Sequence, residues 1–249
     1  MAENPKLAGT NIVDCIPQTG ECPNHCAECF YNGGRFYRTL DEPLIPDAAD
    51  VAGKLVRMNS GHDSNISRQL VVAVACEMRR RGAAGVFFNT SIPNFAFPGP
   101  VVFTCNGREP LFVDIPPHVM FVRVRCNTWD MTGQDALVEH YGKFAAPIVM
   151  TFMGYYNRES VPEAERPKYR WKVHVTNPYW RPTEAAILEV MGRYEGRGVR
   201  MCGTPASSFC RDCLNCEHLY WAAMRRCCYA PGYNVAGLSA HNDIGPALG

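Results

Sequence analysis

The chain has 249 residues, of which 47% are apolar, and 25 basic residues balance 24 acidic ones to a net charge of +1. This length suits one domain of barrel size, or one domain with a small appendage. The near-neutral charge argues against a strong overall attraction to nucleic acid or to an anionic membrane, and no run of about 18 apolar residues predicts a membrane span.

The start of the chain and the cysteine count bear on its compartment. Residues 1–5 lack the basic-then-apolar layout of a signal peptide, so we expect a cytoplasmic protein without a membrane partner. The 13 cysteines are an odd number, which argues against complete internal pairing. In a cytoplasmic chain, so many cysteines indicate metal or redox chemistry rather than disulfides.

The first predicted strand leads directly into a cysteine motif. Residues 11–16 are short, apolar and β-branched, and they are followed by Cys22, Cys26 and Cys29 in the spacing CxxxCxxC. Thiolates are preferred ligands of iron and zinc, and three of them leave one iron of a four-iron cube open to an exogenous ligand. A structural metal knuckle is the alternative interpretation of the motif.

CxxxCxxC near the N-terminus, after a short apolar stretch, resembles the radical S-adenosylmethionine superfamily. The resemblance implies that Cys22, Cys26 and Cys29 hold a catalytic 4Fe-4S cluster whose free iron binds S-adenosylmethionine (SAM). It also implies a reductant, such as flavodoxin or ferredoxin, and the release of a 5′-deoxyadenosyl radical. The family usually has an aromatic residue just before the third cysteine; here Glu28 stands there, and Phe30 follows as a candidate cofactor contact.

Two helices are predicted next, over residues 47–58 and 63–81. In the second, Ile66, Leu70, Val74 and Met78 repeat every four residues and are predicted to share one face. A strand is predicted over residues 85–88, with the polar residues 89–91 at its carboxyl end. The resemblance implies that this position binds the amino group of SAM, so Asn89, Thr90 and Ser91 are candidate cofactor-binding residues. A plain polar loop is the equal alternative.

Two more strands are predicted over residues 101–104 and 119–126. Arg123 and Arg125 fall on one face of the second, because strand side chains alternate. Two arginines on a core strand are costly unless they are paired. They are therefore candidate ligands for a carboxylate of the cofactor or substrate, or else partners in salt bridges, and Asn127 follows them as a candidate contact.

The remaining pattern alternates helices and strands. Helices are predicted over residues 132–144, with Thr132 as N-cap, and 183–194; strands are predicted over 147–153, 169–176 and 199–202. His174, in the second of these strands, is a candidate proton relay or an ordinary half-buried polar group. Such alternation predicts a parallel α/β sheet. Six or seven strands match the partial (β/α)6-type TIM barrel that the resemblance implies for residues 1–200.

A second cysteine group follows in residues 201–249, which we expect to form a cysteine-rich iron–sulfur extension and a tail. Its members, Cys202, Cys210, Cys213 and Cys216, are spaced as in ferredoxin-style ligation and are candidate ligands of a second 4Fe-4S cluster. A structural zinc site with four cysteine ligands is the competing interpretation. The other cysteines, at positions 15, 76, 105, 126, 227 and 228, are predicted to be small buried residues.

The sequence thus predicts a radical SAM enzyme that abstracts hydrogen from a peptide or from a nucleotide or nucleic-acid base. The aromatic and basic stretches 169–172 and 179–181 suit base stacking, and equally an ordinary protein surface. The alternative function is a non-catalytic zinc or iron–sulfur protein that recognises nucleic acid.

Overall fold

The computed structural model of the chain describes residues 4–26, 29, 41–105, 111–173 and 178–229. A seven-stranded parallel sheet has the order β1-β2-β3-β4-β5-β6-β9, so neighbouring strands follow one another along the chain. The strands are β1 (Ile12–Cys15), β2 (Leu55–Met58), β3 (Gly85–Thr90), β4 (Val101–Cys105), β5 (Val119–Cys126), β6 (Ile148–Phe152) and β9 (Val199–Met201). The predicted parallel α/β sheet is confirmed.

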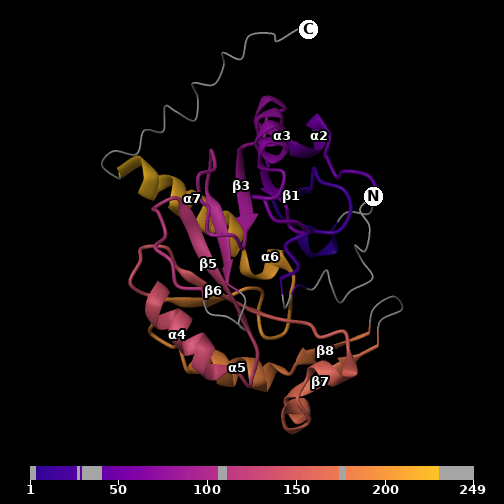
Figure 1. Cartoon of the computed structure of the whole chain (residues 1–249), viewed down its shortest axis with the longest axis vertical. Helices are drawn as coiled ribbons and strands as arrows, with labels where there is room; N and C mark the ends of the chain where they lie inside the picture. The colour runs from indigo at the N-terminus through magenta and orange to yellow at the C-terminus, as the bar shows by residue number, and fades with distance from the viewer. Residues whose placement is uncertain (1–3, 27–28, 30–40, 106–110, 174–177, 230–249) are drawn as a thin grey trace.

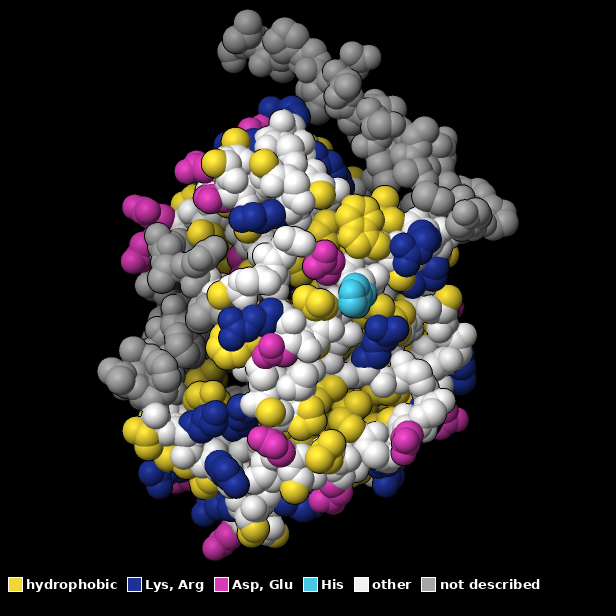
Figure 2. All heavy atoms as spheres, turned by 180° about the vertical axis from the view of Figure 1, so that it is seen from behind, with side chains coloured by type: hydrophobic (Ala, Val, Ile, Leu, Met, Phe, Trp, Pro, Cys, Tyr) yellow, Lys and Arg dark blue, Asp and Glu magenta, His cyan; other side chains and the backbone are white. Residues whose placement is uncertain are grey.

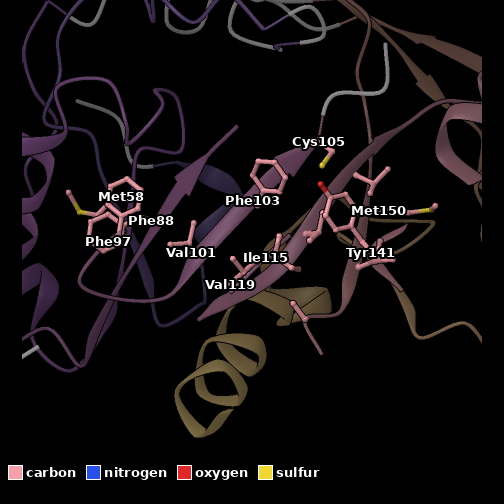
Figure 3. Packing of buried hydrophobic residues seen from close by; sticks show 14 of the residues in the cluster. Met58, Phe88, Phe97, Val101, Phe103, Cys105, Ile115, Val119, Tyr141 and Met150 are labelled. Carbon is pink, nitrogen blue, oxygen red and sulfur yellow. The ribbon is translucent and has the colours of Figure 1, made fainter. Parts of the chain in front are cut away.

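Three helices cover one face of the sheet: α3 (Arg68–Arg80), α4 (Met131–Tyr141) and α5 (Glu184–Gly192). They meet a core built from alternate strand residues, in which Phe88 stacks on Phe97 with ring centroids 4.7 Å apart. Figure 3 shows this packing, with Tyr141 of α4 reaching over the sheet toward Cys105. Burial of this apolar face is the main stabilising contribution on that side.

The opposite face is covered by α7 (Asn215–Tyr229), which runs obliquely across the strands (Figure 1). Leu219, Tyr220 and Ala223 of α7 pack against Leu55, Phe87 and the neighbouring strand residues. Gly85 permits this contact, because a Cβ atom there would lie 2.1 Å from the hydroxyl oxygen of Tyr220. Two short helices, α6 (Cys210–Cys213) and η1 (Pro5–Leu7), lie against each other beside α7.

This second face changes character along the strands. Its apolar residues lie near the amino ends of the strands, and two residues further on each strand carries a polar side chain on the same face. The polar set comprises Asp14 after Ile12, Arg57 after Leu55, Asn89 after Phe87, Thr104 after Val102, Arg123 and Arg125 after Phe121, and Thr151 after Val149. The polar layer therefore lies toward the carboxyl ends of the strands, where catalytic groups of parallel α/β proteins are found.

The sixth predicted strand is not part of the parallel sheet. β7 (Tyr169–Lys172) pairs antiparallel with β8 (Tyr179–Pro182), and this ribbon projects from one end of the molecule (Figure 1). The alternating pattern reflects ribbon packing, since Trp171 and Trp180 meet edge to face at 5.2 Å. The predicted relay residue His174 lies outside the described residues. Two short 3-10 helices, η2 (Arg158–Ser160) and η3 (Glu163–Lys168), precede β7.

The helix predicted over residues 47–58 is wrong. Only α2 (Ala48–Val51) is helical, Gly53 turns the chain with φ +71°, and residues 55–58 form β2. Parallel pairing with β1 on one side and β3 on the other decides the outcome. Strand preference depends on such neighbours, and a short run carries too little local signal to reveal them.

Two helix predictions need smaller corrections. α3 begins at Arg68 rather than near residue 63, and its buried residues are Val71, Ala75 and Met78, whereas Leu70 is 45% exposed. The N-cap of α4 is Asp130, whose Oδ1 accepts a hydrogen bond from the Gly133 N–H, rather than Thr132.

Figure 2 shows basic and acidic side chains interspersed over one face of the molecule, in keeping with the balanced composition. Among the described residues, no helix is both long and apolar enough to cross a membrane.

Candidate metal and cofactor site

One cavity lies at the carboxyl ends of β1 to β5, over the polar layer of the sheet. Cys22, Cys26 and Cys29 all line it, so the fold brings the three predicted ligands to one place. The other lining residues are Asn24 and His25 of the cysteine loop, residues 59–63, Asn89, Thr90 and Ser91, and Thr104, Arg123 and Arg125.

Asp63 is the hub of the hydrogen bonds around this cavity, and it is 4% exposed. Its Oδ2 accepts from the backbone N–H of Ser91 at 2.6 Å and from the Ser91 hydroxyl at 3.0 Å. Its Oδ1 accepts from the Thr90 hydroxyl at 2.7 Å and from the Asn65 N–H at 2.9 Å. A carboxylate with so many donors holds the end of β3 firmly against the loop that follows β2.

The same network reaches the cysteine loop. Asn24 donates through Nδ2 to Ser91 Oγ at 2.8 Å and to Cys26 Sγ at 3.3 Å. Cys26 Sγ and Ser91 Oγ are 3.2 Å apart, and either atom can be the donor. Asp63 thus positions Ser91, and Ser91 with Asn24 positions the central cysteine of the motif.

The loop of residues 59–67, which Asp63 belongs to, was missed by sequence reasoning. It is fastened by bonds from Asn59 N to Cys15 O at 2.8 Å and from Ser64 N to Asn89 O at 3.0 Å. His62 Nε2 also lies 2.8 Å from Gly20 O. The signal was present as an unbroken polar run, residues 59–65, but it points to a site only once residues 55–58 are recognised as a strand.

Two arginines of the polar layer beneath the cavity have different kinds of partner. Arg57 donates to both carboxylate oxygens of Asp14, at 2.6 and 3.0 Å. Burial alone would raise the pKa of Asp14, but the charge and hydrogen bonds of Arg57 outweigh it and lower that pKa. Arg123 instead points Nη1 at two neutral acceptors, Asn89 Oδ1 at 3.5 Å and Thr104 Oγ1 at 3.4 Å.

The second cysteine group gathers on the same face of the sheet. Cys202, in the turn after β9, interacts with Cys210 and Cys213 of α6 and with Cys216 of α7. Contact with the Cys213 thiol, together with the charge of Arg123, lowers the pKa of Cys202 to about 5 despite burial. Burial raises the pKa of Cys216 to about 12.

The donor chemistry of both groups fits iron or zinc, because each collects thiols and no competing hard ligand is required. Within the described ranges, however, no three His, Cys, Asp or Glu side chains are already arranged to hold a metal ion. The thiols are neighbours, and their sulfur atoms would have to converge further on a bound group.

The other predicted site residues have different places. Asn127 is 4% exposed and is absent from the described lining of the cavity. Its Oδ1 accepts from the N–H groups of Trp129 and Asp130, a turn that leads into α4. Phe30 lies outside the described residues.

The cysteines predicted to be buried are so at positions 15, 105, 126 and 227. Cys76 is exposed, and the prediction for it is wrong, because it lies on the outward side of α3. The side chain of Cys228 lies outside the described part.

No family model, no curated protein and no solved structure matches this chain.

Proposed function

We propose that the protein is a radical SAM enzyme that abstracts hydrogen from a peptide or from a nucleotide or nucleic-acid base. The observation that carries the proposal is that three thiols of the described residues, and not four, line one cavity at the carboxyl edge of a parallel sheet. Protein ligands to three irons of a cube leave one iron for a small molecule, and the cavity provides polar groups beside it.

The residues at the cavity then have the following roles. Cys22, Cys26 and Cys29 hold the catalytic 4Fe-4S cluster, and Asn89, Thr90 and Ser91 bind the cofactor at the end of β3. When bound, the cluster and SAM supply an electron and a 5′-deoxyadenosyl radical for hydrogen abstraction. Asp63 is a positioning residue, because it fixes Thr90 and Ser91 by hydrogen bonds.

The wider assignments rest on the same proposal. The seven parallel strands form a partial barrel, and Cys202, Cys210, Cys213 and Cys216 hold a second 4Fe-4S cluster beside it. A cytoplasmic reductant such as flavodoxin or ferredoxin supplies the electron. The hydrogen bond between the Cys202 and Cys213 thiols, and the electrostatic influence of Cys202 on Cys210 and Cys216, support the second cluster.

Anaerobic reconstitution with iron and sulfide tests the proposal. The reconstituted protein is expected to bind about eight irons and, on reduction, to convert SAM into 5′-deoxyadenosine even without substrate. Cys26→Ala is expected to abolish this product, because it removes a cluster ligand. Cys76→Ala, at an exposed cysteine of α3, is the matched control and is expected to leave the product unchanged. Product formation by Cys26→Ala would show that the triad is wrongly chosen.

A second candidate function is a non-catalytic zinc or iron–sulfur protein that recognises nucleic acid. The β7–β8 ribbon favours it, because Arg158 lies over the Trp171 ring at 4.8 Å and the same strand carries the exposed Arg170 and Lys172. Zinc in the purified protein, with no 5′-deoxyadenosine from the reconstituted form, would favour this function over the enzyme.

A further inference from the structure

Arg123 is a cation without a described carboxylate beside it. Among the described residues, no carboxylate forms an ion pair with Arg123, whereas Arg57 on the neighbouring part of the face is paired with Asp14. The ionisable groups that act electrostatically on Arg123 are Cys202 and Cys216, which favour its charged form, and the cations Arg57 and Arg125, which oppose it. Removing a guanidinium from water is costly unless an anion or several good acceptors replace the water.

The direction of the side chain adds to this observation. Nη1 of Arg123 lies at the cavity with Asn89 Oδ1 and Thr104 Oγ1, both at distances typical of weak hydrogen bonds. Thr104 and Arg123 are register partners on β4 and β5, and Arg125 follows two residues later on the same face. Two arginines and one threonine of neighbouring strands therefore line one cavity.

The place of this set within the fold is also informative. Arg123 lines the cavity that holds Cys22, Cys26 and Cys29, and its charge also acts on the second cysteine group. A molecule bound at Arg123 would lie on the polar layer of the sheet, between the two cysteine groups. Guanidinium groups bind carboxylate and phosphate oxygens by paired hydrogen bonds, and neutral groups far more weakly.

We propose that Arg123, with Arg125 and Thr104, forms an oxyanion subsite that holds a carboxylate or phosphate of the substrate between the two cysteine groups. This inference deepens the proposed function and rests on it, because the bound anion belongs to a substrate only if the protein is an enzyme. It narrows the peptide and nucleotide candidates to molecules that present an anionic group to the cavity floor.

Inorganic phosphate is the probe for the subsite. The thermal midpoint of the reconstituted protein is measured against phosphate concentration, with chloride holding the ionic strength constant. The midpoint is expected to rise with phosphate, since a ligand of the folded state stabilises it. Arg123→Gln is expected to weaken the phosphate affinity about tenfold or more, the effect of losing a charge-assisted hydrogen bond. Arg123→Lys should restore part of it.

Arg80→Gln is the matched control, because its side chain lies on the surface of α3 with 74% exposure. It is expected to keep the phosphate response of the unaltered protein. The inference is overturned if the unaltered protein shows no response, or if Arg123→Gln responds as strongly as Arg80→Gln. Loss of iron from Arg123→Gln with an unchanged phosphate response would also overturn it, by assigning Arg123 to the second cysteine group.

A second experiment distinguishes an oxyanion of the substrate from the carboxylate of SAM. SAM carries a carboxylate of its own, so its binding to the unaltered protein is measured with and without phosphate. Unchanged SAM affinity supports a substrate subsite, whereas displacement of SAM by phosphate would assign Arg123 to the cofactor and overturn the substrate assignment. A phosphate response without 5′-deoxyadenosine formation would sink the proposed function while leaving the oxyanion subsite intact.

Discussion

At the scale of single residues, Asp63 determines where the end of β3 lies relative to Cys26. Its two oxygens accept four hydrogen bonds between 2.6 and 3.0 Å from Thr90, Ser91 and Asn65. No cysteine motif or glycine turn marks this residue in the sequence. A buried carboxylate that accepts this many hydrogen bonds contributes strongly to the structure of the site, although it is not one of the thiols.

Asp63→Asn should destabilise the protein, because an amide has a single acceptor oxygen, and its NH2 group would face either the two donors of Ser91 or those of Thr90 and Asn65. The free energy of unfolding, measured by urea denaturation, is expected to fall by about 1–3 kcal/mol. Asp50→Asn, at an exposed position in α2, is the control and should change it by about 0.5 kcal/mol or less. Equal effects of the two variants would contradict the role of Asp63.

The buried pair Asp14–Arg57 makes a prediction about pH. The pKa of Asp14 is lowered in the folded protein. The ionised Asp14 carboxylate therefore contributes fully to stability at pH values above its pKa in the unfolded chain, about 3.9. That contribution is lost as the pH falls from there through the lower folded-state pKa. Asp14→Asn should cost about 3–5 kcal/mol at pH 7, because it leaves Arg57 buried without its charge partner.

Urea denaturation of the unaltered protein and of Asp14→Asn, at several pH values below about 5, checks the direction of this pH dependence. The difference in stability between the unaltered protein and Asp14→Asn should shrink as the pH falls through this window. A difference that stays constant, or grows, toward low pH would show that Asp14 does not owe its ionised state to Arg57.

At the scale of elements, the contacts of α7 with the sheet depend on a missing side chain. Gly85→Ala would place a Cβ atom 2.1 Å from the hydroxyl oxygen of Tyr220 and 2.4 Å from the ring, so helix and strand must separate. We expect a loss of about 1–3 kcal/mol in the free energy of unfolding, as for other overpacked cores.

Gly192→Ala is the matched control, because a Cβ atom there meets nothing within 4 Å and the residue is helical. It should leave stability unchanged or raise it by about 0.5–1 kcal/mol. Combining Gly85→Ala with Tyr220→Ala should cost less than the sum of the single changes, and full additivity would contradict the proposed clash.

The elements also show what sequence could and could not predict. β1, β3, β4, β5 and β6 were predicted because apolar runs between turn residues carry a strong local signal. β2 was missed because its strand state comes from pairing with residues far away in the chain, as Leu55 pairs with Ile12, whereas β8 pairs with the nearby β7 and was missed because a four-residue strand carries little local signal. The three-cysteine cavity was predictable from spacing, whereas Asp63 was hidden because its partners lie 27 and 28 positions away in the chain.

At the scale of the whole molecule, one face of one sheet supports two cysteine groups with an arginine layer between them. Arg123 is related to both cysteine groups, since it lines the first cavity and interacts electrostatically with Cys202 and Cys216. The two groups come from opposite ends of the chain, at residues 22–29 and 202–216. The fold therefore makes them neighbours without making them one site.

Separate sites should load separately. Cys26→Ala and Cys213→Ala are each expected to bind about four irons after reconstitution, against about eight in the unaltered protein and in the Cys76→Ala control. Iron analysis with absorption spectra checks this expectation. If either variant lost all of its iron, the two groups would depend on each other, contrary to the arrangement described above.

The position of α7 in the chain has a consequence for biosynthesis. This helix comes after all seven strands, yet it covers apolar residues of β1 through β6. While the ribosome is still translating residues before 215, that sheet surface lacks its cover from α7 and is open to self-association. Nascent molecules should therefore need a chaperone, or slow release, until the last turn of α7 has emerged.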